Sequence, residues 1–403
     1  MTGGALESAL PRLRAETPAC AEVVHFNHAG DSPSPRTVLD VIEAHLEREA
    51  LIGGYEAEGE AVERIEEIYD SIGRLIGAQT DEIAIVENAT RAWDMVFYAI
   101  PFSAGDRILT SVSEYGSNTI AFLQVAERTG ARIEVVPNDE HGQLSVAALA
   151  DMLDDRVKLV SVSHMPTNGG LVQPAAEIGR LAREAGAFYL LDACQTVGQM
   201  PIDVNELGAD ALTATSRKYL RGPRGLGFLY VRRGQVRELT PPFLDIHAAE
   251  WVARDRYEVR RDARRFENWE SPIAAKLGLG RAIDYAIDLG LGAIWARVEP
   301  LAARLRAALA AVPGVTVLDL GQVKGGIVTF TIGAVPASEV VATLRAQRIN
   351  TSVSPVTSTR YDMEARQLDD IVRASVHYLT TDEEIRTLVN AVSAISSGSP
   401  PGS

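Results

Sequence analysis

The sequence has 403 residues, with 39 basic and 54 acidic side chains and a formal net charge of −15 at pH 7. Its 46% hydrophobic and 23% charged residues are typical of soluble globular proteins, which excludes a disordered or fibrous chain, and its length predicts about two or three domains. The acidic balance argues against a nucleic-acid partner, because affinity for a phosphate backbone depends on basic patches.

Residues 1–24 are expected to form a separate N-terminal segment. They lack the charged-then-apolar layout of a secretion signal, and the sequence contains no run of about 18 apolar residues. The two cysteines, Cys20 and Cys194, are too few for a disulfide framework or a cysteine-based metal cluster. We therefore expect a cytoplasmic protein with no membrane partner and no metal site.

Residues 25–270 alternate short β-branched runs with amphipathic stretches. This alternation predicts a large α/β domain with a mostly parallel sheet and helices on both faces, in which ligands collect at the carboxyl ends of the strands. Gly130 and Gly186 end two of the helices in the way that helix C-termini prefer. Strands are predicted at 82–88, 107–113, 132–137, 157–164, 187–193, 210–217 and 225–233, the last near an antiparallel edge, and helices at 91–100, 119–130, 147–154 and 175–186.

Residues 271–395 predict a second, smaller α+β domain. The tail over 396–403 is small, polar and rich in proline and glycine, so it is expected to be disordered. Helices are predicted at 271–290, 293–312, 338–347 and from Asp382, and strands at 315–320, 327–333, 349–354 and 372–379.

Only four lysines occur in the sequence, so any chemistry that needs a lysine amine has four candidates. Lys158, Lys276 and Lys324 are each explained as surface charges. Lys218 is different, because it follows a predicted strand and is followed by RGPRGLG (221–227), whose glycines and proline allow a sharp turn and a close approach by a ligand. Glycine-rich turns are common, so the pattern alone leaves both a functional lysine and a plain turn open.

Two further features accompany Lys218. Asp192 ends an apolar strand, where a carboxylate is costly unless it meets a cation or a strong donor; a helix N-cap is the alternative. ENATRA (87–92) lies at a strand–helix junction, where Asn88, Thr90 and free backbone N–H groups suit a phosphate. A lysine that forms a Schiff base, an aspartate that keeps a pyridine nitrogen protonated and a helix N-terminus that holds a phosphate together fit a pyridoxal phosphate enzyme.

With these residues in place, the sequence resembles the class V aminotransferases over about residues 25–390. This branch of fold type I includes cysteine desulfurases, isopenicillin N epimerase-like proteins and C–S lyases. TSRKYLRGPRGLGFLYV (215–231) is similar to the family's S-x-H-K followed by G-P-x-G-x-G, and DACQ (192–195) resembles its D-A-x-Q. The resemblance implies a PLP-dependent transferase fold of type I with a seven-stranded, mostly parallel sheet, a smaller α+β C-terminal domain, and pyridoxal 5'-phosphate as cofactor.

The resemblance also implies a role for each matching residue. Lys218 would carry the cofactor, Asp192 would contact the pyridine nitrogen, and Tyr115 in SEYGSN (113–118) would stack on the ring. Arg217 stands where the family commonly has histidine, a departure that keeps a cationic donor near the phosphate. The remaining expected cofactor contacts are Ala89, Thr90 and Thr215 at the phosphate, and Gln195 and Thr167 near the ring's 3-oxygen.

The substrate side is implied by a second set of matches. Arg373 in VRASVHYLTTDEEI (372–385) is similar to the family's arginine that grips the substrate α-carboxylate, with a structural salt bridge as the alternative. FNHAGDSP (26–33) makes Asn27 and His28 further substrate candidates. RFENWES (265–271) resembles a segment that approaches the neighbouring subunit's phosphate, which implies a homodimer. Residues 243–257 and 351–362 are expected at the entrance, where Arg360 suggests an anionic or polar substrate group.

The absence of a cysteine from residues 321–372 limits the reactions that this site could catalyse. Cysteine desulfurases of the family need a nucleophilic cysteine on a loop ahead of the carboxylate arginine, and residues 321–372 contain none, whereas Cys194 beside Asp192 is interpreted as a small buried hydrophobe. We expect a C–S lyase that acts by β-elimination on a cysteine S-conjugate. GGYEAEGEA (53–61), RKYLRGPRG and FENWES are similar to ergothioneine-type C–S lyases, which implies biosynthesis of a sulfur-containing natural product.

Other reactions remain open on the same residues. Decarboxylation coupled to oxidative deamination, transamination or epimerisation of a similar amino acid would use the same lysine, aspartate and arginine, because the outcome depends on which bond to Cα breaks. A catalytically silent scaffold or regulator is a further alternative, against which the joint presence of Lys218, Asp192 and Arg373 argues.

Overall fold

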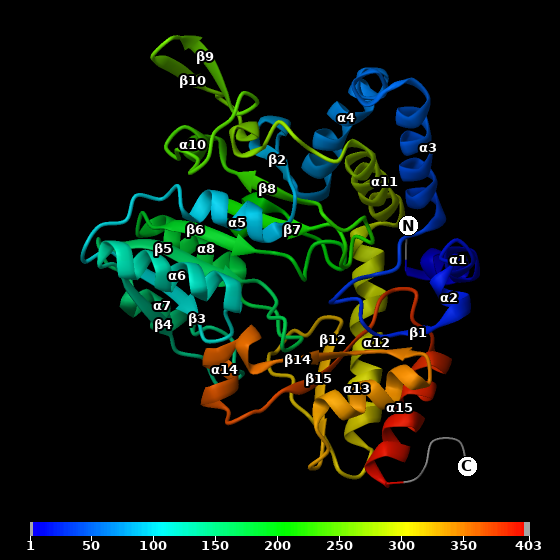
Figure 1. The fold of residues 1–403 in the computed structure, drawn as a ribbon. Coiled ribbons are helices and arrows are strands. Elements are labelled where there is room, and N and C mark those ends of the chain that lie inside the picture. Colours follow the sequence, from blue (N-terminus) through cyan, green and yellow to red (C-terminus); the bar gives the residue numbers. More distant parts are fainter. Residues whose placement is uncertain (1–2, 399–403) are drawn as a thin grey trace.

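The large part of the molecule is built on a seven-stranded sheet in the order β2-β8-β7-β6-β5-β3-β4, shown in a computed structural model that describes residues 3–398 (Figure 1). Every neighbouring pair is parallel except those that β8 makes with β2 and β7. The predicted mostly parallel seven-stranded sheet is thereby confirmed. The strands are β2 (Ile83–Val86), β3 (Arg107–Ser111), β4 (Arg132–Val136), β5 (Val157–Ser163), β6 (Phe188–Asp192), β7 (Ala211–Thr215) and β8 (Gly227–Val231).

Both faces of this sheet are buried, which is why its central strands read as continuous apolar runs. Along β2, Ile83 and Ile85 belong to one hydrophobic core and Ala84 and Val86 to another, because successive strand side chains point to opposite faces. Ile178 of α8 joins the first core, and Trp93, Phe97 and Phe122 of α5 and α6 join the second. The helices after these strands are α5 (Ala89–Phe97), α6 (Gly116–Thr129), α7 (Val146–Met152), α8 (Ala175–Glu184), α9 (Val204–Leu207) and α10 (Arg233–Val236).

The C-terminal part contains a separate four-stranded antiparallel sheet in the order β11-β12-β15-β14. The N-terminal residues are joined to it, since α1 (Gly3–Ala15) packs on α12 and β1 (Val24–His25) pairs with β13 (Ile349–Asn350). Its strands are β11 (Val315–Val317), β12 (Ile327–Ile332), β14 (Ser352–Ser354) and β15 (Ile371–Ser375), and its main helices are α12 (Leu291–Ala310), α13 (Ala337–Ala346) and α15 (Asp382–Ser396). The tail expected to be disordered begins at the last residue of α15, and its residues 399–403 lie outside the described part of the chain.

Three long helices pack together beside the large sheet. α11 (Ile273–Leu289) contacts both α3 (Arg36–Ile52) and α4 (Gly54–Ile76), and it then leads into α12. Lys276 on α11 is only 6% exposed, so its prediction as a surface charge is wrong; it lines a small pocket together with Glu87 and Asn268. The expected domain boundary near residue 270 lies just ahead of α11 and stays a prediction.

A hairpin projects from the large sheet, away from the rest of the molecule (Figure 1). It consists of β9 (Ala249–Ala253) and β10 (Arg256–Val259), and most of its side chains are exposed. The short remaining elements are α2 (Ala19–Glu22), η1 (Thr80–Glu82), η2 (Ala263–Phe266), η3 (Val356–Ser358) and α14 (Arg360–Ala365). No helix in residues 3–398 combines the length and apolarity needed to cross a bilayer.

Three buried imidazoles predict that the fold loses stability in mild acid. Burial lowers the pKa of His164 to about 4 and holds the pKa values of His28 and His377 well below 6.5. Because the unfolded chain binds these protons near pH 6.5 and the folded chain does not, stability falls as pH drops below about 6.5, by about 1.4 kcal/mol per pH unit for each imidazole. Melting temperatures at pH 7.5 and 5.5 measure this, and we expect a clear decrease at pH 5.5.

The His377→Gln variant removes one of the titrating imidazoles, so it should show a smaller decrease between these two pH values. Its amide can still donate to the Tyr219 carbonyl that His377 Nε2 contacts at 3.1 Å. His141→Gln is the matched control, since His141 is exposed. Equal melting temperatures at the two pH values in the unsubstituted protein would contradict the prediction.

Candidate functional site

A cavity of about 470 Å³ opens where the carboxyl ends of β5, β6 and β7 meet the first turns of α5 and α6. This is the edge at which ligands of parallel α/β sheets bind. The structure brings all of the expected cofactor residues to its lining: Ala89, Thr90, Tyr115, Thr167, Asp192, Gln195, Thr215, Arg217 and Lys218.

Lys218 lies on the turn that follows β7. The turn is fixed by the backbone hydrogen bond from Arg221 to the Lys218 carbonyl (2.9 Å) and by Gly198, whose φ of 92° and missing Cβ let the chain pass against Tyr219. Burial lowers the pKa of Lys218. Its amine makes no hydrogen bond or ion pair with the described residues and faces the cavity.

Asp192 ends β6 and points its carboxylate at the same cavity. Its Oδ1 accepts the backbone N–H of Cys194 at 2.9 Å, and its Oδ2 lies 3.4 Å from Asn118 Nδ2. The residues after Asp192 form turns and no helix, so the N-cap alternative does not hold. No cation of residues 3–398 forms an ion pair with Asp192, which leaves the carboxylate available to a cationic ring nitrogen.

The start of α5 forms the anion-binding end of the cavity. Asn88 caps the helix by accepting the N–H of Arg91 at 2.9 Å, and the first N–H groups of the helix, at Ala89 and Thr90, have no intrahelical partner. Gly227 on β8 permits this arrangement, because a Cβ there would lie 2.9 Å from Ala89 N and 2.5 Å from the Ala214 carbonyl oxygen. Together with Arg217, these donors suit a phosphate.

The residues around the middle of the cavity leave polar atoms without partners. Gln195 is buried, donates from Nε2 to the Ala29 carbonyl at 3.1 Å, and has no partner for Oε1 within the described chain. A buried polar atom without a partner is costly, so a ligand group at this point would stabilise the site. The free amine, the free carboxylate, the helix N-terminus and this amide are the donor and acceptor set that pyridoxal phosphate requires.

Arg373 reaches the site from β15 of the smaller sheet. Its guanidinium donates to Thr167 Oγ1 (2.6 Å) and Ser352 Oγ (3.2 Å), and it lies 3.5 Å from Asn27 Oδ1. Burial lowers its pKa to about 10. No carboxylate within residues 3–398 pairs with it, so the salt-bridge alternative does not hold and the group is available to a ligand carboxylate.

His28 is placed differently from the expectation. Its ring packs between those of His25 (4.7 Å) and His377 (4.8 Å), its Nδ1 lies 3.0 Å from Ser32 Oγ, and it is absent from the cavity lining. Arg360, expected near the entrance, lies on the surface and pairs with Glu364. Both residues are held by protein partners instead of facing the cavity.

The lining also contains residues that the motifs did not identify: Asn118, Ser163 and Met165. Ser163 is the last residue of β5, at the edge where Asp192 ends β6, and Asn118 lies three residues after Tyr115, near the start of α6. Their positions relative to the predicted strands and to Tyr115 are the sequence features that could have identified them as lining residues. Within residues 3–398, no group of three or more metal-ligating side chains is assembled.

Comparison with known proteins gives matches over nearly the whole chain. A probable cysteine desulfurase from Methanothermobacter thermautotrophicus is 29% identical over 382 residues, covering 93% of this chain and 95% of that protein. A probable cysteine desulfurase from Synechocystis is 30% identical over 385 residues, covering 92% and 90%.

Solved structures also match nearly the whole chain. A cysteine desulfurase from Thermococcus onnurineus superposes with a TM-score of 0.88 at 25% identity, covering 96% of this chain and 98% of that one. A cystine C–S lyase in complex with cysteine persulfide gives 0.84 at 25% identity, covering 94% and 99%, and a further structure with the same TM-score and identity holds glycine linked to its PLP cofactor. The aminotransferase class-V family model matches residues 24–388. The chain therefore belongs to the class-V aminotransferases, a family of enzymes whose typical cofactor is pyridoxal phosphate.

Proposed function

We propose that this protein is a pyridoxal-phosphate-dependent C–S lyase that acts by β-elimination on a cysteine S-conjugate. The observation that carries the proposal is the absence of a thiol on the loop between β14 and β15. Val356–Ser358 (η3) and Arg360–Ala365 (α14) fill this loop, and it contains no cysteine. Asn168 anchors it to the cavity side, donating to the Pro355 carbonyl at 3.2 Å and accepting from Ser354 Oγ at 2.6 Å.

The one thiol that lines the cavity is poorly suited to accept sulfur. Burial raises the pKa of Cys194 well above its ordinary value, and the charge of Asp192 adds to this effect. The thiolate is the nucleophilic form, so Cys194 is held in its unreactive state. Sulfur cleaved from a substrate would thus leave with its own substituent as a free thiol.

The substrate would be held by Arg373 and Asn27. A guanidinium without a protein anion forms strong bidentate hydrogen bonds with a carboxylate, which fixes the amino acid and decides which Cα bond faces the catalytic groups. Thr167 Oγ1 accepts from Arg373 and can still donate its own proton into the cavity. The sheet of the smaller domain therefore orients a substrate over groups supplied by the larger one.

Lys218 is the residue that would move the proton. Its lowered pKa favours the neutral amine, which can remove the Cα proton as a general base. The electron pair of the Cα–H bond then forms a Cα–Cβ double bond as the Cβ–S bond breaks, and the leaving thiolate takes up a proton. Bound pyridoxal phosphate supplies the electron-withdrawing ring that makes this Cα–H bond acidic, and Asp192 keeps the ring nitrogen protonated. Hydrolysis of the released enamine gives pyruvate and ammonia.

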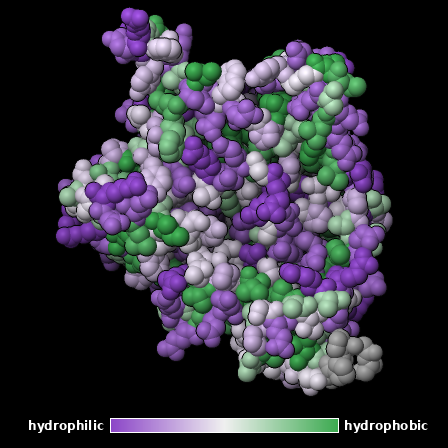
Figure 2. All heavy atoms as spheres, in the orientation of Figure 1, coloured by the Kyte–Doolittle hydropathy of each residue, from purple (hydrophilic) through white to green (hydrophobic). Residues whose placement is uncertain are grey.

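We also propose that two copies of the chain form a homodimer. Four apolar or aromatic side chains lie exposed on α3 and α4, where Figure 2 shows hydrophobic surface: Leu46, Leu51, Tyr55 and Val62. A second exposed group surrounds the projecting hairpin and the segment 265–271: Phe243, Ile246, Trp251, Tyr257 and Trp269. Exposed apolar surface of this extent is typical of protein contacts. By its motifs, we place the enzyme in the synthesis of a sulfur-containing natural product.

The proposed reaction predicts defined products. Incubation of the holoenzyme with a cysteine thioether should release thiol and pyruvate in equal amounts, because the Cβ–S bond breaks and no protein thiol retains the sulfur. Mass spectrometry and a thiol assay measure both. A product that keeps its sulfur and has lost CO₂ would show decarboxylation instead, and the absence of thiol and pyruvate across a panel of thioethers would overturn the proposal.

Replacing Arg373 should impair substrate binding and leave the cofactor in place. Loss of a charge-assisted bidentate contact costs about 2–3 kcal/mol, so we expect Arg373→Leu to raise KM by about 30- to 150-fold. Arg360→Leu is the matched control, since that arginine is exposed and pairs with Glu364. An unchanged KM in Arg373→Leu would show that the carboxylate binds elsewhere.

The alanine variants of Lys218 and Cys194 should differ sharply in cofactor absorbance and in activity. Lys218→Ala is expected to lose the absorbance band that covalently held pyridoxal phosphate gives near the visible edge, together with activity, because the chain then lacks the amine. Cys194→Ala should keep the band and activity within about twofold, since the thiol is interpreted as a small hydrophobe. Loss of turnover in Cys194→Ala would support a covalent role for this thiol.

A further inference from the structure

Glu114 is a buried carboxyl that the reaction above does not use. It stands in the turn between β3 and α6, immediately before Tyr115, and is 1% exposed. Four donors surround it: Oε1 accepts from Tyr115 N (2.8 Å), Asn118 Nδ2 (2.9 Å) and Ser163 Oγ (2.6 Å), and Oε2 accepts from Thr110 Oγ1 (3.0 Å). No cation of the described chain forms an ion pair with it.

The partners of Glu114 connect it to the cavity. Tyr115, Asn118 and Ser163 all line the cavity, so the Glu114 carboxyl holds three of the lining residues in place. Asn118 Nδ2 also lies 3.4 Å from Asp192 Oδ2, which places a single amide nitrogen between two carboxylates. Asp192 is the charged group that faces Glu114 among the elements packed around it, and the buried phenol of Tyr189 on β6 is the other titratable neighbour.

Two carboxylates that share one amide in a poorly solvated place repel each other unless a cation lies close by. Burial raises the pKa of Glu114 to about 7, and the charge of Asp192 contributes in the same direction. A protonated ring nitrogen at Asp192 would supply the missing positive charge and would favour the ionised form of both carboxyls.

We propose that Glu114 is a positioning residue that acts through Asn118 on Asp192 and through the Tyr115 backbone on the stacking ring, so that two carboxylates instead of one stabilise the cationic cofactor ring. The inference rests on the binding of pyridoxal phosphate and is independent of the proposed lyase reaction. A purely structural role, as a polar link between β3, α6 and β5, is the competing explanation.

The test compares charge with geometry. In Glu114→Gln, Oε1 can still accept from its three donors and Nε2 can donate to Thr110 Oγ1, so the contacts remain and the charge is lost. We expect the dissociation constant of pyridoxal phosphate from the full-length chain to rise about tenfold, since a charge at this range acts through a low dielectric. The pKa of the holoenzyme's absorbance band should fall, because the protonated form loses a stabilising anion.

The matched control is Asp210→Asn. Asp210 is also a buried carboxylate next to β6, but it lies at the opposite end of the strand, where it accepts from Tyr189 N at 2.9 Å and pairs with Arg232. This variant should lower the melting temperature and leave both cofactor measurements unchanged. If Glu114→Gln behaves in the same way, the proposal is overturned and Glu114 is a structural residue.

Asn118→Leu provides a second, independent variant in case Glu114→Gln does not fold. It removes the shared amide and leaves the other three donors to Glu114, so cofactor affinity and the band pKa should shift in the same direction. In a double-mutant cycle, Glu114→Gln should have a smaller effect when Asn118 is already leucine. Fully additive effects would show that Glu114 does not act through Asn118. Neither readout needs a substrate, so failure of the lyase assay and failure of this proposal remain distinguishable.

Discussion

The cavity depends on cations that the protein leaves without anionic partners. Arg217 and Lys218 line it, Arg373 contacts the lining residue Thr167, and within residues 3–398 none of the three forms an ion pair. A buried charge without a partner costs several kcal/mol. A fold tolerates this cost where a bound ligand of opposite charge offsets it. The positive groups thus define the ligand as an anion at two places, a phosphate at the start of α5 and a carboxylate at Arg373, with Asp192 as the acceptor for a cationic nitrogen between them.

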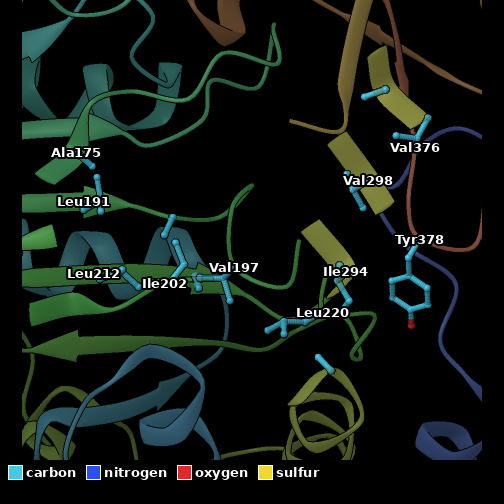
Figure 3. Close-up of a cluster of buried hydrophobic side chains, with 14 of the residues drawn as sticks. Ala175, Leu191, Val197, Ile202, Leu212, Leu220, Ile294, Val298, Val376 and Tyr378 are labelled. Atoms are coloured by element: carbon cyan, nitrogen blue, oxygen red, sulfur yellow. The ribbon is translucent and has the colours of Figure 1, made fainter. Parts of the chain in front are cut away.

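This arrangement requires the two sheets to hold a fixed relation to each other. Figure 3 shows Leu220, two residues after Lys218, near Ile294 and Val298 of α12 and Tyr378, all in one continuous hydrophobic core. Arg221, which has a left-handed φ of 63° and is 1% exposed, donates to the Pro33 carbonyl and to the hydroxyls of Tyr378 and Thr17. The loop that carries Lys218 is therefore joined to the N-terminal segment and to the strand end beyond Arg373, so a movement of either sheet would displace the amine.

Much of this site could be predicted because its residues follow their strands directly. The strands of a buried parallel sheet are readable as apolar runs. Residues such as Asp192, the last residue of a strand, and Lys218, three positions beyond a strand end, must meet at one edge. Residues whose role depends on partners distant in the sequence are harder to predict. The ring of His28 stacks on that of His377, and Glu114 accepts hydrogen bonds from Asn118 and Ser163. The densely charged exposed faces of α3 and α4 obscure their helical pattern, although Ile65, Ile68 and Ile72 show a helical spacing.

Under the proposed function, this chain would differ from a desulfurase in one loop on a shared scaffold. The scaffold would supply an amine at Lys218, an acceptor for the pyridine nitrogen at Asp192 and a carboxylate-binding group at Arg373. Together these groups would make the Cα–H bond acidic without determining where the sulfur goes. The destination of the sulfur would depend on the groups near it. The loop after β14, which Asn168 holds in place, contains the hydroxyl residues Thr357, Ser358 and Thr359 and no cysteine. A hydroxyl group accepts sulfur poorly, whereas the same loop with a thiolate would capture it. Under the proposed function, this loop would favour release of a thiol, and the rest of the site would function unchanged with either outcome.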